Sequence, residues 1–389
     1  MNVKFRLWQY AISDEMAVKM LDQAGYFGEK ILGKKVINLC SGYGTILKHI
    51  YFRYINQYYR KNGNLNGIEK ELTSLIVGVE IDKLLCHQSI FDLSFYLLNF
   101  GLNVNPSVIN FDALRLGDLF SCQTNAANIK VKLPHFPEVL DNFKLDGFDF
   151  CFCVPPQELR IEPSNFKMRV LNRYKPDDFF YDYYLNFIQI GLKLVKDSGK
   201  VAAICSADFW FNGEIDGFSH KLTKLVESAD LIFKSQELNY SGLMGLFVFG
   251  KRGNNGCVKF KTEVEENFLT LPLAKLPEQI LGGYIEFLFR LSINFASNFD
   301  IMCIKQTKEC KNPIYYLTQD GQILVAKNYS NKPANAEIII ESNLSSKQLN
   351  YLTRNKIFSQ MLNCCLFKEK SESQQFKIIN NFLSFNLMK

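Results

Sequence analysis

Glycines and carboxylates follow three successive apolar runs of the sequence, and together these residue types can hold a nucleoside. Gly42 and Gly44 form a Gly-x-Gly turn directly after the first run. Glu80 and Asp82 follow the second run, and Asp112 follows the third. Glycines allow a sharp turn whose bare main chain a ligand can approach, and carboxylates accept hydrogen bonds from ribose hydroxyls or an amino group. The order of turn, acid and acid therefore predicts a nucleoside pocket.

Plainer interpretations of the same residues are a tight structural turn and solvated strand ends. A phosphate-binding loop is not favoured, because the sequence has no G-x-x-x-x-G-K-[ST] and the turn is not G-x-G-x-x-G. The expected ligand is a nucleoside without phosphates, such as S-adenosylmethionine, rather than a dinucleotide.

A fourth apolar run ends in two prolines, in the stretch FDFCFCVPPQE (148–158). Proline fixes the backbone φ and removes a hydrogen-bond donor, so two prolines end a strand and set the path of the loop that follows. Taken alone, this pair indicates only a strand terminator.

A parallel sheet would bring the ends of these runs together. From about Lys35 to Arg252, short β-rich runs alternate with longer helical stretches, the pattern of a sheet covered by helices. The most regular helix is predicted over 182–197. The predicted strands are 34–40, 75–81, 107–113, 148–154, 200–206, 229–235 and 243–251. The sequence thus predicts an α/β fold, a Rossmann-like sheet of seven strands.

The regular alternation of strand-like and helix-like stretches ends after KRGNNG (251–256), and polar residues become more frequent from there on. A domain boundary near 255–265 is the simplest explanation. We therefore predict a larger domain over residues 1–255 and a smaller C-terminal domain over residues 256–389.

Composition narrows the class of protein. The 11 cysteines are scattered without a C-x-x-C pair and only 4 histidines occur, so we expect reduced core cysteines and no metal site. No apolar run is long enough to span a membrane and the first residues lack the apolar core of a signal peptide, so we expect a cytoplasmic protein. A formal net charge of +6 fits a polyanionic partner without requiring one.

The ordered motifs resemble those of the gamma-class, adenine-specific DNA amino-methyltransferases of restriction-modification systems. NLCSGYGTIL resembles their Asp-Pro-Ala-Cys-Gly-Ser-Gly-Thr-Phe-Leu motif, with Asn38 at the usual acid and Tyr43 at the usual Ser. In the upstream motif, Ile12 and Ser13 stand where the family has Thr-Pro. The matching stretches are 8–21, 38–47, 77–82, 111–114, 180–210 and 245–252, and together they span roughly residues 5–253, about two thirds of the chain.

This resemblance implies an S-adenosylmethionine-dependent methyltransferase fold and assigns the cofactor to particular residues. The implied cofactor-binding residues are Asn38, Cys40, Gly42, Gly44, Glu80, Ile81, Asp112 and Ala113. By the same analogy, the C-terminal third would recognise the target or bind a partner.

The resemblance fails at the catalytic motif. In the family the fourth strand ends in Asn-Pro-Pro-Tyr, whose Asn accepts hydrogen bonds from the target amino group while the Tyr stacks on the flipped base. This chain keeps Pro155 and Pro156 but has Val154 at the Asn position and Gln157 at the Tyr position. The loop is therefore expected to keep its shape and to lose its chemistry.

Basic and aromatic residues alternate in the stretch that follows the prolines, which suits phosphate contacts and base stacking. The alternative is a solvated loop before a helix. The predicted nucleic-acid-binding residues are Arg160, Lys167, Arg169, Arg173 and Lys175, with Tyr240 at the family's second base-stacking position.

The favoured hypothesis is a catalytically impaired homologue of DNA adenine methyltransferases that binds nucleic acid or supports an active methyltransferase or restriction-modification subunit. One alternative is an active methyltransferase of DNA or RNA that uses Val-Pro-Pro-Gln. A weaker alternative is a specificity component that uses the fold only as a scaffold.

Overall fold

The computed structural model describes the protein in separate segments. They are residues 12–116, 147–156, 183–207, 222–232, 244–253, 256–262, 269–272, 281–286, 314–318, 323–326, 336–341, 358, 360–361, 364–371, 374–375, 377–379 and 381–382. The helices are α1 (Asp14–Ala24), η2 (Glu29–Ile31), α2 (Thr45–Asn62), α3 (Ile68–Leu75), α4 (Lys83–Leu98), η3 (Ala113–Arg115), α7 (Tyr183–Leu194) and α12 (Cys365–Lys368). The strands are β1 (Val36–Asn38), β2 (Ile76–Glu80), β3 (Val108–Asn110), β4 (Phe148–Cys153), β5 (Val195–Ser206), β6 (Val226–Ile232), β7 (Met244–Gly250), β8 (Cys257–Thr262), β9 (Leu269–Pro272), β10 (Ile314–Thr318), β11 (Ile323–Ala326) and β12 (Ala336–Glu341).

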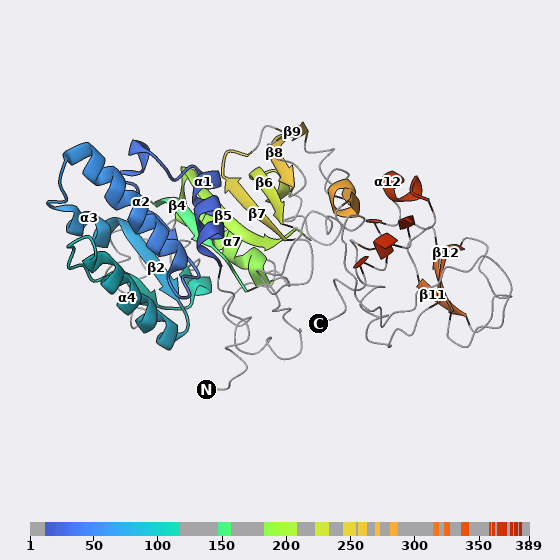
Figure 1. The fold of residues 1–389 in the computed structure, drawn as a ribbon, viewed down its shortest axis with the longest axis horizontal. Helices are drawn as coiled ribbons and strands as arrows, with labels where there is room; N and C mark the ends of the chain where they lie inside the picture. Colours follow the sequence, from blue (N-terminus) through green and yellow to red (C-terminus); the bar gives the residue numbers. More distant parts are fainter. Residues whose placement is uncertain are drawn as a thin grey trace, which may run out of the picture.

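One large sheet organises the N-terminal two thirds of the chain (Figure 1). Its strand order is β3-β2-β1-β4-β5-β7-β6-β8-β9. From β3 to β5 along this row, each strand is parallel to the next one. The next strand, β7, is antiparallel to both β5 and β6. All seven predicted strands are present within a sheet of nine described strands, and β7 is reversed, so the predicted α/β fold with a Rossmann-like, mostly parallel sheet is confirmed.

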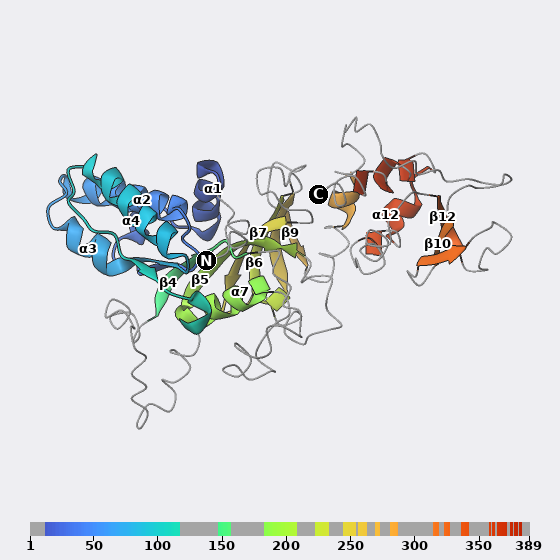
Figure 2. The same ribbon diagram turned by 90° about the horizontal axis from the view of Figure 1, so that it is seen from below.

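Helices cover both faces of this sheet, and β1, β2 and β7 are buried on both sides. α1, α2, α3 and α4 lie on one face and α7 lies on the other (Figure 2). Successive residues of a strand enter different cores: Val36 packs with the α1–α4 layer, and Ile37 packs with the layer that contains α7. Among the described helices, none is long and apolar enough to cross a bilayer.

Two details differ from the sequence prediction. The helix predicted over 182–197 ends at Leu194, and β5 begins directly at Val195. The large sheet also continues through β8, parallel to β6, to β9, which ends at Pro272. The boundary near 255–265 would divide this sheet, and the division of the chain into two domains stays a prediction. A separate three-stranded sheet has the order β11-β10-β12.

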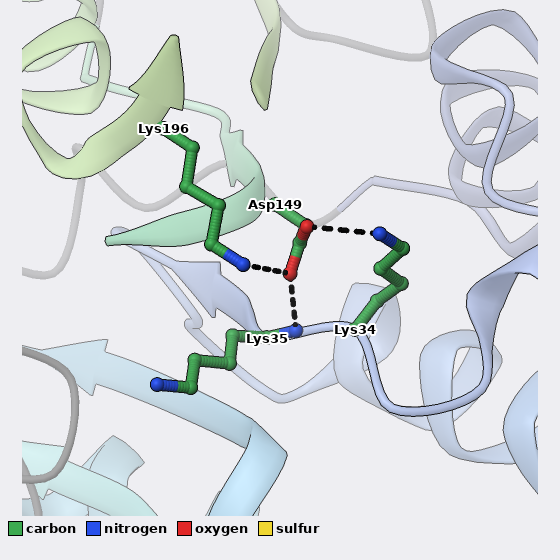
Figure 3. A network of polar contacts seen from close by, with 4 residues as sticks. All are labelled: Lys34, Lys35, Asp149 and Lys196. Atoms are coloured by element: carbon green, nitrogen blue, oxygen red, sulfur yellow. Dashed lines mark hydrogen bonds and ion pairs between the residues drawn. The ribbon is translucent and has the colours of Figure 1, made fainter. Parts of the chain in front are cut away.

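Asp149 fastens the beginning of β4 to its neighbours, at the end of that strand opposite the double proline (Figure 3). Its carboxylate accepts a hydrogen bond from the Lys35 amide at 2.9 Å and forms ion pairs with Lys34 at 3.2 Å and Lys196 at 3.0 Å. Burial opposes ionisation of Asp149, but the Lys35 amide and the two ammonium groups outweigh it and lower the pKa of this carboxyl.

We expect Asp149→Asn to lower the free energy of unfolding at pH 7 by about 1–3 kcal/mol, because both ion pairs are lost at a buried carboxylate. A carboxyl whose pKa is lowered by folding adds stability above its unfolded pKa, and that stability disappears as the pH falls through the folded pKa. The difference between the two proteins in urea unfolding should therefore start to shrink as the pH falls below about 4 and should keep shrinking as the pH falls further, through the lowered pKa of the folded protein.

Asp197→Asn is the matched control for this network. The side chain of Asp197 is 89% exposed, and its pair with Lys251 spans 3.8 Å. Exposed pairs of this kind contribute little, so the control should match the wild type. An equal loss in both variants, or a difference at Asp149 that is as large at about pH 3 as at pH 7, would contradict the role given to the buried carboxylate.

Candidate functional site

The residues predicted to bind a nucleoside lie at one edge of the sheet. β1, β2, β3 and β4 are adjacent and parallel, so their carboxyl ends face the same way. The Gly42–Gly44 turn follows β1, Glu80 ends β2, Asp112 follows β3 and Val154 follows β4. Open α/β sheets bind ligands at this edge.

The glycine turn needs its glycines for two different reasons. Gly42 has φ 51° and Gly44 has φ 83°, a backbone conformation that favours glycine. A Cβ on Gly44 would lie 2.7 Å from the Ser89 Oγ, so the turn packs tightly against α4 there. A Cβ on Gly42 would meet nothing within 4 Å, which leaves bare main chain beside open space.

Glu80 joins the loop after β1 to the loop after β2. One carboxylate oxygen accepts a hydrogen bond from the Gly42 amide at 2.8 Å, and the other accepts one from the Asp82 amide at 2.9 Å. Burial raises the pKa of Glu80, and these two backbone hydrogen bonds partly oppose that rise. Each carboxylate oxygen can accept a further hydrogen bond, so the group orders the turn and still has acceptor capacity for a ribose hydroxyl.

Asp112 is held at the third strand end. Its side chain caps η3 by accepting a hydrogen bond from the Leu114 amide at 3.0 Å. Burial raises the pKa of Asp112, while the Leu114 amide and Arg115 lower it. The cap engages one carboxylate oxygen, so the other can accept a hydrogen bond from an amino group.

Asn110 is a site residue that the sequence analysis missed. Its side-chain amide donates to the carbonyl oxygens of Glu80 at 3.0 Å and Ile81 at 2.9 Å, which ties β3 to the end of β2. Ile81 itself is 57% exposed, an apolar side chain beside the acidic strand end. Ala113 is buried. An Asn just before a strand-end acid was the available signal for Asn110.

The end of β1 contains polar side chains without partners. Asn38 is fully buried, and within the described residues neither of its side-chain polar atoms has a hydrogen-bond partner; the same holds for the Ser41 hydroxyl. Buried groups of this kind are rare and are often completed by water or a ligand. Cys40 is partly buried, and burial raises the pKa of its thiol, with further rises from Cys153 and Glu80.

Val154 directly follows β4 and begins the loop that contains the two prolines, and it lies beside the loop that follows β1. β1 and β4 pair with Asn38 opposite Phe152, and the Leu39 amide donates to the Phe152 carbonyl at 3.0 Å. Val154 is partly buried and packs against the core on the α1–α4 face. Its side chain has no hydrogen-bond acceptor.

The described part of the upstream motif begins at Ile12 and enters α1, which lies against α2. Ser13, which stands where the family has Pro, caps α1 by accepting from the Met16 amide at 3.2 Å. Asp14 then reaches α2, where it pairs with Lys48 at 2.6 Å and His49 at 2.7 Å. The hydrogen bonds from Lys48 and His49 lower the pKa of Asp14.

Three features of the structure fit the binding of S-adenosylmethionine by these residues. Open space lies over the main chain of Gly42. The buried amide of Asn38 has no partner among the described residues. Glu80 and Asp112 keep unused acceptor capacity, and Ile81, the residue after Glu80, is exposed. The adenosine part of the cofactor requires acceptors of this kind together with an apolar surface.

Other predicted residues lie outside the part of the chain that the structure describes. They are Gln157, Arg160, Lys167, Arg169, Arg173, Lys175 and Tyr240. The described residues contain no group of three His, Cys, Asp or Glu side chains that could hold a metal ion.

No protein-family model matches the sequence, and no curated protein matches it. Several solved structures are similar to parts of the chain at low identity. A methyltransferase subunit of a type I restriction-modification system from Streptococcus thermophilus is 14% identical, with a TM-score of 0.43 over 70% of this chain and 53% of that one. A DrdV–DNA complex is 13% identical, with a TM-score of 0.45 over 67% and 28%.

The type ISP restriction-modification enzyme LlaGI, in complex with a DNA substrate mimic, is 9% identical, with a TM-score of 0.48 over 80% of this chain and 34% of that one. The chain therefore spans about half or less of the length of these three proteins. At these TM-scores, the fold assignment rests on the strand order and pairing of the sheet.

Proposed function

We propose that the protein is a homologue of the S-adenosylmethionine-dependent adenine-specific DNA methyltransferases that binds the cofactor but transfers its methyl group poorly. In this proposal it acts as a nucleic-acid-binding subunit or supports an active partner. The observation that carries the proposal is the contrast at one sheet edge: Glu80 and Asp112 are held as acceptors, while Val154 brings no acceptor.

The binding half of the proposal assigns roles to the residues on the first three strand ends. Glu80 accepts from the ribose hydroxyls, Asp112 accepts from the adenine amino group, and Ile81 packs on the adenine face. The main chain of Gly42 gives close access, and Asn38 and Cys40 border the end of β1. S-adenosylmethionine, when bound, supplies an electrophilic methyl group.

The catalytic half concerns what Val154 and Gln157 do to a bound base. An Asn in place of Val154 would accept from the target amino group and expose the nitrogen lone pair, whereas Val leaves that amino group with one acceptor fewer. A lost hydrogen bond to a reacting group commonly costs about 10²–10³ in rate. Gln157 in place of an aromatic ring forfeits stacking worth about 1–3 kcal/mol.

Labelled S-adenosylmethionine on mixed-sequence DNA, with no partner protein present, tests the proposal. The unmodified chain should transfer label at least about a hundredfold more slowly than a relative with an intact Asn-Pro-Pro-Tyr motif. Rapid turnover would favour the alternative, an active enzyme that uses Val-Pro-Pro-Gln. A chain that binds neither cofactor nor nucleic acid would leave only the scaffold function.

Nucleic-acid binding is proposed to run through the basic and aromatic stretch after the prolines, together with part of the C-terminal domain. Neutralising Arg169, Arg173 and Lys175 together should lower the salt dependence of DNA affinity by up to about three units of slope, because each lost phosphate contact releases about one counterion fewer. Fluorescence anisotropy at several salt concentrations measures this slope. An unchanged slope would reassign the stretch to a protein interface.

A further inference from the structure

Helix α4 has apolar side chains on both of its faces, although only one face is covered. Its inner face is buried through Leu85, Leu93 and Leu97, and the last two belong to the core of the α1–α4 layer. A helix that is apolar all round normally has both faces buried. The outer face is instead open to solvent, and Figure 1 shows α4 on the outside of the helix layer.

The exposed residues of the outer face form a regular stripe, which we call the α4 seam: Leu84, Gln88, Phe91, Phe95 and Leu98. Their spacing is 4, 3, 4 and 3 residues, the repeat by which a helix pairs with a second helix. Leu84 is 61% exposed, Phe91 67%, Phe95 64% and Leu98 54%. Isolated exposed apolar residues need no explanation, but a continuous stripe marks an interaction surface.

We propose that the α4 seam pairs with the α4 seam of a second copy of this chain, with the two helices parallel. Parallel pairing places Gln88 opposite Gln88 of the second copy, at the only polar position of the seam. It also places His87 on the flank of one helix near Asp92 on the flank of the other, twice by symmetry. His87 can donate a hydrogen bond to the Asp92 carboxylate, and this donor and acceptor would meet at two symmetric places in a pair of identical helices.

The neighbouring side chains are compatible with this arrangement. His87 and Asp92 are exposed, and Asp92 accepts a hydrogen bond from the Gln88 side chain at 2.9 Å, so the polar position is ordered before pairing. The four apolar side chains expose on the order of 450 Å². Two copies would bury about 1,000 Å², which is the lower end for specific interfaces. Interfaces at this lower end are typical of weak, transient pairs, so we expect a concentration-dependent dimer.

Sedimentation velocity of the full chain between about 1 and 200 µM tests the dimer. The wild type should shift from one chain to two over this range. Phe91→Glu should weaken dimerisation by about a hundredfold or more, because it places a charge in the middle of the seam. Phe52→Glu is the matched control, since Phe52 is an exposed phenylalanine of α2 at 43% exposure, and it should dimerise like the wild type.

A wild type that stays monomeric at about 200 µM would overturn the proposal and leave the seam to a different protein, as would an unchanged dimer in Phe91→Glu. Helix direction has its own test. Gln88→Cys should cross-link two copies when copper phenanthroline is added as the oxidant, beyond the background of the exposed Cys257 and Cys365 in the wild type. A Gln88→Cys protein that dimerises without extra cross-linking would contradict the parallel arrangement.

Discussion

A chain carrying both Val154→Asn and Gln157→Tyr is expected to methylate DNA faster than the unmodified chain, by about a hundredfold or more if each lost contact is restored. This corresponds to about 2.7 kcal/mol or more in activation free energy. The Val154→Asn change would return an acceptor for the target amino group, and the Gln157→Tyr change would return a stacking ring. The backbone that presents Val154 is already in place, because β4 pairs with β1 and ends directly before this residue.

The two single variants should each gain less than the double variant, since both residues act on one bound base. Val154→Leu combined with Gln157→Leu is the matched control: it changes the same positions without an acceptor or an aromatic ring, and it should stay as slow as the wild type. Initial rates of label transfer to mixed-sequence DNA measure all of these chains. A double variant no faster than its control would show that the defect lies elsewhere in the site.

Removal of the Glu80 side chain should have the largest effect on cofactor binding. Glu80→Ala is expected to weaken S-adenosylmethionine binding by about 1.5–3 kcal/mol, roughly 10- to 150-fold. It should also lower the free energy of unfolding without cofactor, because the amides of Gly42 and Asp82 lose the carboxylate that accepts from them. Calorimetry and urea unfolding measure the two effects.

Asp112→Asn separates the two effects. Asn caps helices about as well as Asp, so the bond from the Leu114 amide is kept while the charge at the adenine position is removed. The cofactor affinity should fall, and the free energy of unfolding should stay close to that of the wild type. If Glu80→Ala and Asp112→Asn bind the cofactor as the wild type does, the ligand does not occupy these strand ends.

Seven of the nine described strands of the large sheet, β1 to β7, could be predicted because each is a short apolar run bounded by turn residues. The strand ends also gave the correct placement of Gly42, Glu80 and Asp112 at one edge, since parallel strands share an edge. The sequence could not predict that Glu80 accepts hydrogen bonds from both the Gly42 and the Asp82 amides, because these bonds depend on how closely the loops after β1 and β2 approach each other. Asn110 was missed for the same reason.

The extension of the sheet through β8 and β9, and the α4 seam, are two further features that could not be predicted from the sequence. β8 alternates in burial, with Val258 and Phe260 buried and Lys259 exposed, so a strand signal was present but fell at the expected domain boundary. In α4, apolar residues occur on every side, and such a pattern by itself indicates a buried helix. Only the structure distinguishes the covered residues, such as Leu93, from the exposed ones, such as Phe91.

Calorimetric titration of the unmodified full chain with S-adenosylmethionine tests the central claim most directly, because an impaired methyltransferase homologue still needs its cofactor pocket. We predict saturable binding of one cofactor per chain with a dissociation constant below about 1 mM, weakened in Glu80→Ala. No heat of binding at millimolar cofactor would contradict the account, and would point to Asn38 and the altered upstream motif as the residues that abolished the pocket.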